Sequence, residues 1–132
     1  MRDIIVIGAS AGGVQALSAL VAGLPRDLAA AVFIVLHVPA EPPSFLPEIL
    51  SRETILPIGH AKNGERITAG RIYIAPSDQH LILEGAFVRL VHGPKENFHR
   101  PSIDTLFRSA ARWAGPRVIG VVLTSVLQRD RP

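Results

Sequence analysis

The first thirteen residues constrain the fold more than any other part of the chain. Residues 3–7 read Asp-Ile-Ile-Val-Ile, and residues 8–13 read Gly-Ala-Ser-Ala-Gly-Gly. An apolar run rich in β-branched residues is typical of a strand buried on both faces, as in a parallel sheet. The glycines let the backbone turn sharply from this strand into a helix. The turn presents Ser10 at the carboxyl end of the strand, where open α/β sheets place their sites.

Two chemical motifs share these residues. Residues 8–12 fit G-x-S-x-G, the pattern that exposes a nucleophilic serine in serine hydrolases. Gly8, Ser10 and Gly13 also have the spacing of the dinucleotide-binding pattern G-x-G-x-x-G, with serine in place of the middle glycine. A third interpretation is a tight turn whose serine takes no part in chemistry, because patterns this short recur by chance.

The residue after the second predicted strand bears on this choice. Residues 31–36 form another apolar run, and His37 follows them. A dinucleotide site needs an acidic residue about 20 positions after the glycines to bind the ribose hydroxyls. A histidine does not accept two hydroxyls as a carboxylate does, but it can take a proton from a serine. His37 therefore favours a hydrolase over a dinucleotide-binding protein, although a histidine that merely closes a strand is also compatible.

Composition limits the class of protein. The chain has 132 residues, of which 48% are hydrophobic, enough for one domain with a single core. It has no cysteine, which excludes disulfides and thiolate metal sites, and we predict no metal and no cofactor. No apolar run approaches the ~20 residues of a membrane span, and residues 1–24 lack the pattern of a signal peptide, so we expect a cytoplasmic protein that is not embedded in a membrane.

Charge suggests the kind of partner. The net charge is +3 and the sequence pI is near 10.2, which mildly favours acidic partners. The arginines are scattered and only 5% of residues are aromatic, so we expect no nucleic acid to bind.

Apolar periodicity predicts alternating strands and helices along the rest of the chain. We expect helices over 14–24, 44–50 and 101–114, strands over 71–75 and 118–123, and a hairpin over 80–91. This order predicts an α/β fold: a doubly wound, mostly parallel sheet with helices on both faces and a small antiparallel hairpin. The expected buried residues of the second and third helices are Phe45, Leu46, Ile49 and Leu50, and Ile103, Leu106, Phe107, Ala110, Ala111 and Ala114.

The last predicted strand lacks the helix that should cover it. Strand 118–123 runs into residues 124–132, which show no helical pattern. A buried parallel strand is normally followed by a helix that packs on the sheet. We therefore expect either a partner chain that covers this edge of the sheet or a shortened product of a longer domain.

Five blocks of sequence are together far more specific than the serine motif alone. They are residues 7–13, 35–39, 73–81, 99–111 and 120–124. In this order they resemble the CheB family, the protein-glutamate methylesterases of bacterial chemotaxis, over nearly the whole chain. The resemblance implies a single truncated CheB-like domain over residues 1–132, without the C-terminal part of the family domain and without a receiver domain. It also implies hydrolysis of glutamate methyl esters on chemoreceptors, with deamidation of glutamine in some members.

The resemblance implies a serine–histidine–aspartate triad, with Ser10 as nucleophile and His37 as general base. The family's last loop reads roughly T-G-x-x-x-D-G. Here Thr124 matches, but Arg129 stands at the aspartate position, and Asp130, one residue later, is the candidate third member. A slip of one residue moves a carboxylate by about 3.5 Å. We therefore predict a poor catalyst. The alternative function is a catalytically impaired fragment or a non-catalytic module that binds a receptor helix.

The resemblance also implies a methylated chemoreceptor as partner, recognised at an acidic helical region. We expect Arg100 and Arg108, with His99, to hold neighbouring carboxylates of that region. The alternative for Arg108 is an ion pair with Asp104, four residues before it on the predicted helix. We expect His80 on a pocket rim or in a loop.

Overall fold

The computed structural model describes residues 2–37, 45–92 and 101–123. Its centre is a parallel sheet of five strands in the order β3-β4-β2-β1-β7, and a separate antiparallel hairpin lies beside it. This confirms the predicted α/β fold. The strands of the sheet are β1 (Ile4–Ser10), β2 (Ala31–His37), β3 (Ile58–His60), β4 (Ile72–Ile74) and β7 (Val118–Leu123), and those of the hairpin are β5 (His80–Glu84) and β6 (Phe87–Val91).

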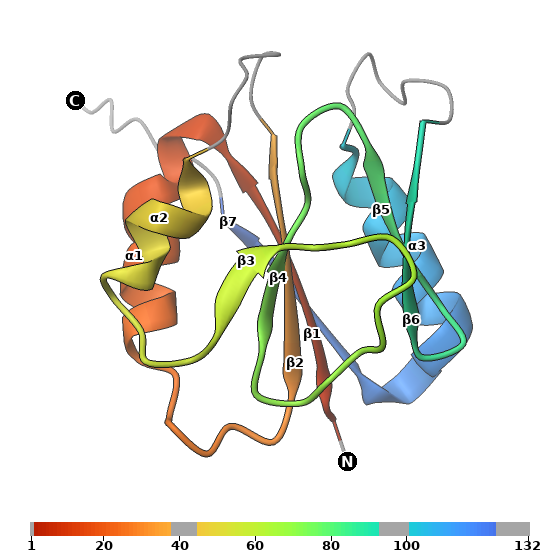
Figure 1. Ribbon diagram of the computed structural model, residues 1–132, viewed down its shortest axis with the longest axis horizontal. Helices are drawn as coiled ribbons and strands as arrows, with labels where there is room; N and C mark the ends of the chain where they lie inside the picture. Colours follow the sequence, from red (N-terminus) through yellow and green to blue (C-terminus); the bar gives the residue numbers. More distant parts are fainter. Residues whose placement is uncertain (1, 38–44, 93–100, 124–132) are drawn as a thin grey trace, which may run out of the picture.

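Helices cover both faces of the sheet. Helices α1 (Val14–Ala22) and α2 (Leu46–Ser51) lie on one face, and α3 (Ile103–Ala114) lies with the hairpin on the other (Figure 1). Short 3-10 turns, η1 (Ala11–Gly13) and η2 (Gly115–Arg117), precede α1 and follow α3. Both α1 and α3 begin at the carboxyl edge of the sheet, at the top of Figure 1. The N-termini of α1 and α3 therefore both lie at this edge of the sheet.

Two apolar clusters form the core, one on each face of the sheet. The cluster beneath α3 includes Val6, Phe33 and Tyr73. The rings of Phe33 and Tyr73 stack, with 4.9 Å between their centroids. The cluster beneath α1 and α2 includes Ile7 and Ile34. Consecutive residues along β1, and likewise along β2, thus belong to opposite clusters, as the two-residue period of a strand requires.

Two of the predicted buried faces need correction. Leu46 and Leu50 of α2 are buried, but Ile49 is 42% exposed and Phe45, the residue before the helix, is 61% exposed. A helix of six residues has room for only one narrow buried stripe, so the predicted face was too wide. In α3, Ala111 is exposed while the rest of the predicted face is buried or half-buried. Ser44, the first residue of the helix predicted over 44–50, lies outside the described residues.

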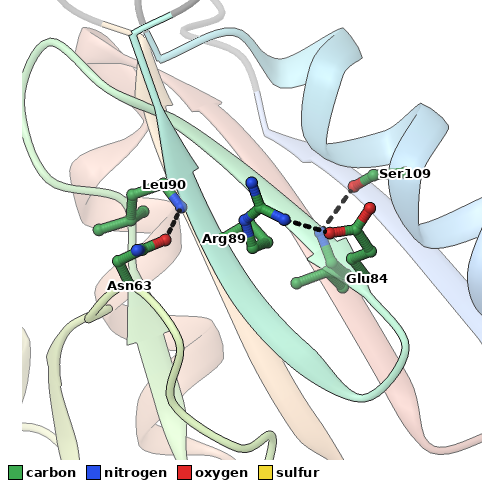
Figure 2. Close-up of polar contacts among 6 residues, drawn as sticks. Asn63, Glu84, Arg89, Leu90 and Ser109 are labelled. Atoms are coloured by element: carbon green, nitrogen blue, oxygen red, sulfur yellow. Dashed lines mark hydrogen bonds and ion pairs between the residues drawn. The ribbon is translucent and has the colours of Figure 1, made fainter.

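Polar contacts join the hairpin to its surroundings (Figure 2). The backbone N–H of Leu83 donates to Oγ of Ser109 at 3.0 Å, a buried bond between β5 and α3. On the other side, the N–H of Leu90 donates to Oδ1 of Asn63 at 2.9 Å. Arg89 and Glu84 form an exposed ion pair at 2.7 Å. The hairpin is therefore held against α3 by a buried bond and tied within itself by a solvated one.

An ion pair closes the amino edge of the sheet. Arg117 donates to both carboxylate oxygens of Asp3, at 2.8 and 3.1 Å, and its guanidinium also lies 5.1 Å from the ring centroid of Trp113. The hydrogen bonds from Arg117 lower the pKa of the Asp3 carboxyl. This pair ties the residue before β1 to the residue before β7.

Strand β7 is an edge strand with exposed apolar side chains. Ile119 is 37% exposed and Val122 is 61% exposed. Among the described residues, only β1 pairs with β7 in the sheet. No helix in the described part of the chain is long and apolar enough to cross a membrane.

Candidate active site

Ser10 and His37 lie side by side at the carboxyl edge of the sheet. Strands β1 and β2 are parallel neighbours, and in their register Ser10 is the partner of His37. Each is the last residue of its strand. Neighbouring strands are about 4.8 Å apart, so the two residues are within reach of each other. The two strand ends that carry Ser10 and His37 are therefore adjacent in the sheet.

The two side chains also leave the same face of the sheet. Val6 and Val35 both belong to the cluster beneath α3. Ser10 follows Val6 by four residues of one strand, and His37 follows Val35 by two residues of the next. Because side chains alternate along a strand, Ser10 and His37 point to the face that α3 covers. Both residues are half-buried, and Nε2 of His37 is a buried atom.

The backbone at Ser10 is relaxed. Its φ and ψ are −84° and 169°, which is ordinary extended backbone, and β1 runs through Ser10 directly into η1. The predicted position of Ser10 at the carboxyl end of the strand is confirmed. The predicted turn began with the glycine at residue 8, but the strand continues through Ser10 and the turn starts at Ala11. Ser10 therefore stands at the N-terminus of a helical segment, whose first N–H groups have no partner within the helix.

The absence of a side chain at Gly8 lets α3 pack closely against β1 near Ser10. A Cβ placed on Gly8 would lie 2.5 Å from Cγ2 of Ile103, in the first turn of α3. The first glycine of G-x-S-x-G thus lets a helix approach the strand that carries Ser10. Gly13 has a similar role on the other side, because its Cβ would lie 3.1 Å from the carbonyl oxygen of Leu123 at the end of β7.

His80 does not lie where the sequence predicted. We expected a pocket rim or a loop, but His80 is the first residue of β5 and is only 2% exposed. Its Nδ1 accepts a hydrogen bond of 3.2 Å from the backbone N–H of Ser102. The cover comes from α3, which follows more than twenty residues later, so no local pattern signals this burial.

Several predicted site residues are not brought into this cluster by the described structure. Asp130, His99 and Arg100 lie outside the described residues. Arg108 is an exposed residue of α3, as is Asp104. Strand β7 ends at Leu123, which pairs in register with Ala9 of β1. Ala9 is the residue before Ser10. The described part of the chain therefore ends next to the strand end that carries Ser10.

The described residues, 2–37, 45–92 and 101–123, contain no group of three or more histidine, cysteine, aspartate or glutamate side chains that could hold a metal ion. At the described part of this edge, Ser10 and His37 bring a hydroxyl and an imidazole together beside helix N-termini. That set suits nucleophilic attack by an activated serine.

The comparison with protein families is decisive. The family model described as CheB methylesterase matches residues 5–128. The chain belongs to the CheB methylesterase family. Among solved structures, it is similar to the crystal structure of the Thermotoga maritima CheB methylesterase catalytic domain, with a TM-score of 0.84 and 32% identity. That match covers 92% of this chain and 67% of the solved chain.

Curated CheB relatives agree with this assignment. One, from Anaeromyxobacter dehalogenans, is named protein-glutamate methylesterase/protein-glutamine glutaminase 2 and is 41% identical over 124 residues. Another, from Yersinia pestis, is named protein-glutamate methylesterase/protein-glutamine glutaminase and is 42% identical over 129 residues. These matches cover 94% and 95% of this chain but only 36% and 37% of the two relatives. The chain thus spans little more than a third of their length.

Proposed function

We propose that this chain carries the nucleophile and the general base of a protein-glutamate methylesterase, Ser10 and His37. The observation that supports this most strongly is that these two residues are register partners at the ends of neighbouring parallel strands. The names of the curated relatives supply the substrate class, a methylated glutamate side chain.

In the proposed reaction, Oγ of Ser10 attacks the carbonyl carbon of a glutamate γ-methyl ester while the imidazole of His37 takes the hydroxyl proton. The bond to the methoxy oxygen then breaks, and His37 returns the proton so that methanol leaves. Water attacks the resulting acyl-serine with His37 again as base, which releases the glutamate carboxylate and restores Ser10. With glutamine as substrate, the leaving group is ammonia.

The oxyanion of the tetrahedral intermediate needs hydrogen-bond donors. Backbone N–H groups at the start of η1 follow Ser10 directly and have no acceptor within their own helix. Donors of this kind stabilise an oxyanion in a site that excludes water. We assign them this role.

The remaining parts of the proposal concern partners and the third member of the triad. We keep Asp130 as the candidate third member, and a methylated chemoreceptor with an acidic helical region as the cytoplasmic substrate. We also keep Arg100, Arg108 and His99 as its contacts. The exposed apolar residues of β7 support packing of a partner chain, or of further residues of the domain, on this edge.

Covalent labelling tests the proposed nucleophile. The chain is treated with a fluorophosphonate, which reacts with activated serines, and the modified residue is located by peptide mass spectrometry. We expect an adduct on Ser10 in the wild type and in Ser18→Ala, a control in the following helix, and none in Ser10→Ala. Release of methanol from a peptide with γ-methyl glutamate should follow the same order. A wild-type chain that is labelled elsewhere, or not at all, contradicts the proposed function.

A further inference from the structure

His80 makes a contact that the proposed mechanism does not use. Its imidazole is buried at the start of β5, and Nδ1 accepts the hydrogen bond from the N–H of Ser102. Ser102, itself only 3% exposed, is the N-cap of α3. A neutral imidazole that accepts at Nδ1 carries its proton on Nε2. Histidine is thus used here as an acceptor at a helix N-terminus.

This contact completes a cap that the helix cannot complete alone. Oγ of Ser102 accepts from the N–H of Thr105 at 3.3 Å, which is one half of a capping box. The other half is normally a Glu or Gln at the third helical position, whose side chain accepts from the N-cap N–H. That position holds Thr105 here, so His80 supplies the missing acceptor from a neighbouring element.

The capped turn is the part of α3 that touches the strand of the nucleophile. Ile103, the residue after the cap, lies against Gly8, with 2.5 Å between its Cγ2 and the position of a Cβ on Gly8. Gly8 precedes Ser10 by two residues and shares its face of the sheet. A shift of the first turn of α3 would therefore move Ile103 against the end of β1.

We propose that His80 is a positioning residue for the Ser10–His37 pair. Its Nδ1 completes the N-terminal cap of α3 and so holds Ile103 on Gly8, which fixes the end of β1. This inference rests on the proposed function of Ser10 and His37.

The structure offers a matched control in the same pair of elements. The bond from the N–H of Leu83 to Oγ of Ser109 also joins β5 to α3 and is also buried. It lies about two helical turns from Ser102, away from the carboxyl edge of the sheet. Removing either bond should lower stability, but only the loss of the His80 bond should disturb Ser10.

The test compares three variants of the full chain. His80→Asn keeps a hydrogen-bond acceptor, because Oδ1 of asparagine is bonded to Cγ as Nδ1 of histidine is. His80→Leu fills a similar space without an acceptor. Ser109→Ala removes the control bond between β5 and α3. The measurement is the rate of fluorophosphonate addition to Ser10, at a temperature where circular dichroism shows each variant folded. We expect His80→Leu to react about 10- to 100-fold more slowly, the scale of a misplacement of about 1 Å. His80→Asn should recover most of the rate, and Ser109→Ala should react like the wild type.

Three results would overturn the positioning role. They are an unchanged rate in His80→Leu, an equal loss in Ser109→Ala, and no recovery in His80→Asn. A wild-type Ser10 that does not react contradicts the proposed function instead. In that case, hydrogen exchange of the Ser102 amide tests whether His80 completes the cap. Faster exchange in His80→Leu, but not in His80→Asn, supports the cap. Equal protection in the wild type, His80→Leu and His80→Asn overturns it.

Discussion

Ile103 occupies the space that any side chain at residue 8 would need. The Cβ of an alanine at this position would approach three carbon atoms of Ile103 to between 2.5 and 2.8 Å. The helix that contributes Ile103 begins at the same edge of the sheet as Ser10 (Figure 1). The glycine that opens the serine motif is therefore required by helix packing, in addition to any demand of the turn.

Gly8→Ala should destabilise the fold and slow the reaction of Ser10. Forcing a methyl group into a packed site costs about 1–3 kcal/mol. We expect a fall of that size in the free energy of unfolding from urea titrations, together with slower fluorophosphonate addition.

Gly23→Ala is the matched control for this substitution. Gly23 has φ of −85°, and a Cβ there would meet its nearest neighbour at 3.6 Å. Alanine at such a position reduces the entropy of the unfolded chain and can stabilise by about 0.4–1 kcal/mol. Equal effects of the two substitutions would contradict the packing role of Gly8.

His37→Ala should abolish the activation of Ser10. A positioned general base contributes roughly 10²- to 10⁴-fold to a proton-transfer step, and we expect a loss in that range in methanol release and in covalent labelling. His92→Ala is the control, because His92 is an exposed histidine whose side chain is 63% accessible. Similar losses in both variants would argue against a specific role for His37.

Strand ends could be predicted because the chain marks them with apolar runs. The run before Gly8 and the run before His37 are each buried strands, and adjacent parallel strands bring their carboxyl ends together. The two apolar runs therefore locate the strand ends that carry Ser10 and His37, and this requires no knowledge of α3. Asp130 could not be located in this way, because its position depends on the path of a loop rather than on a strand.

Burial by distant elements was beyond local patterns. Helical spacing tells which residues share a face, but not how much of that face a neighbour covers. Helical spacing grouped Phe45 and Ile49 with the buried residues of α2, yet both are exposed, and Phe45 precedes the helix. His80 shows the reverse, since an imidazole at the start of a hairpin is buried by the N-terminus of a later helix. Tertiary contacts decided these positions.

Removal of the buried hydrogen bond at Ser109 should cost more than removal of the exposed ion pair at Glu84 (Figure 2). Ser109→Ala leaves the N–H of Leu83 without its acceptor, and an unsatisfied buried donor costs about 1–3 kcal/mol. Glu84→Gln breaks a pair whose side chains are 52% and 63% exposed, and such pairs contribute about 0–1 kcal/mol. Urea denaturation of both variants measures the difference, and a larger loss in Glu84→Gln would contradict this ranking.

The Asp3–Arg117 pair should make stability depend on acid pH. The hydrogen bonds from Arg117 lower the pKa of Asp3 in the folded state below its ordinary value of 3.8. The folded state thus binds the proton less tightly than the unfolded state, so this contribution is complete above that value and is lost as pH falls through the folded pKa. Asp3→Asn should therefore reduce stability at neutral pH and have a progressively smaller effect as the pH falls below 3.8.

Denaturation of the wild type, Asp3→Asn and Asp27→Asn at neutral pH and at a pH below 3.8 tests this expectation. Asp27 is an exposed residue after α1 and serves as the control for loss of a negative charge. A difference between wild type and Asp3→Asn that grows on acidification would have the wrong sign and would contradict the assignment.

The position of a carboxylate after β7 should limit turnover. In the CheB family pattern T-G-x-x-x-D-G, an aspartate stands five residues after the threonine. This chain has Arg129 at that position, followed by Asp130. Loss of the aspartate from a serine protease triad lowers turnover by about 10⁴-fold. We expect slow methanol release from the wild type and faster release from the double variant Arg129→Asp/Asp130→Gly, which restores the family order. Arg131→Asp adds one negative charge nearby and should not accelerate the reaction. Asp130→Asn separates the remaining possibility, because a large loss of activity in that variant would show that Asp130 already serves as the third member of the triad.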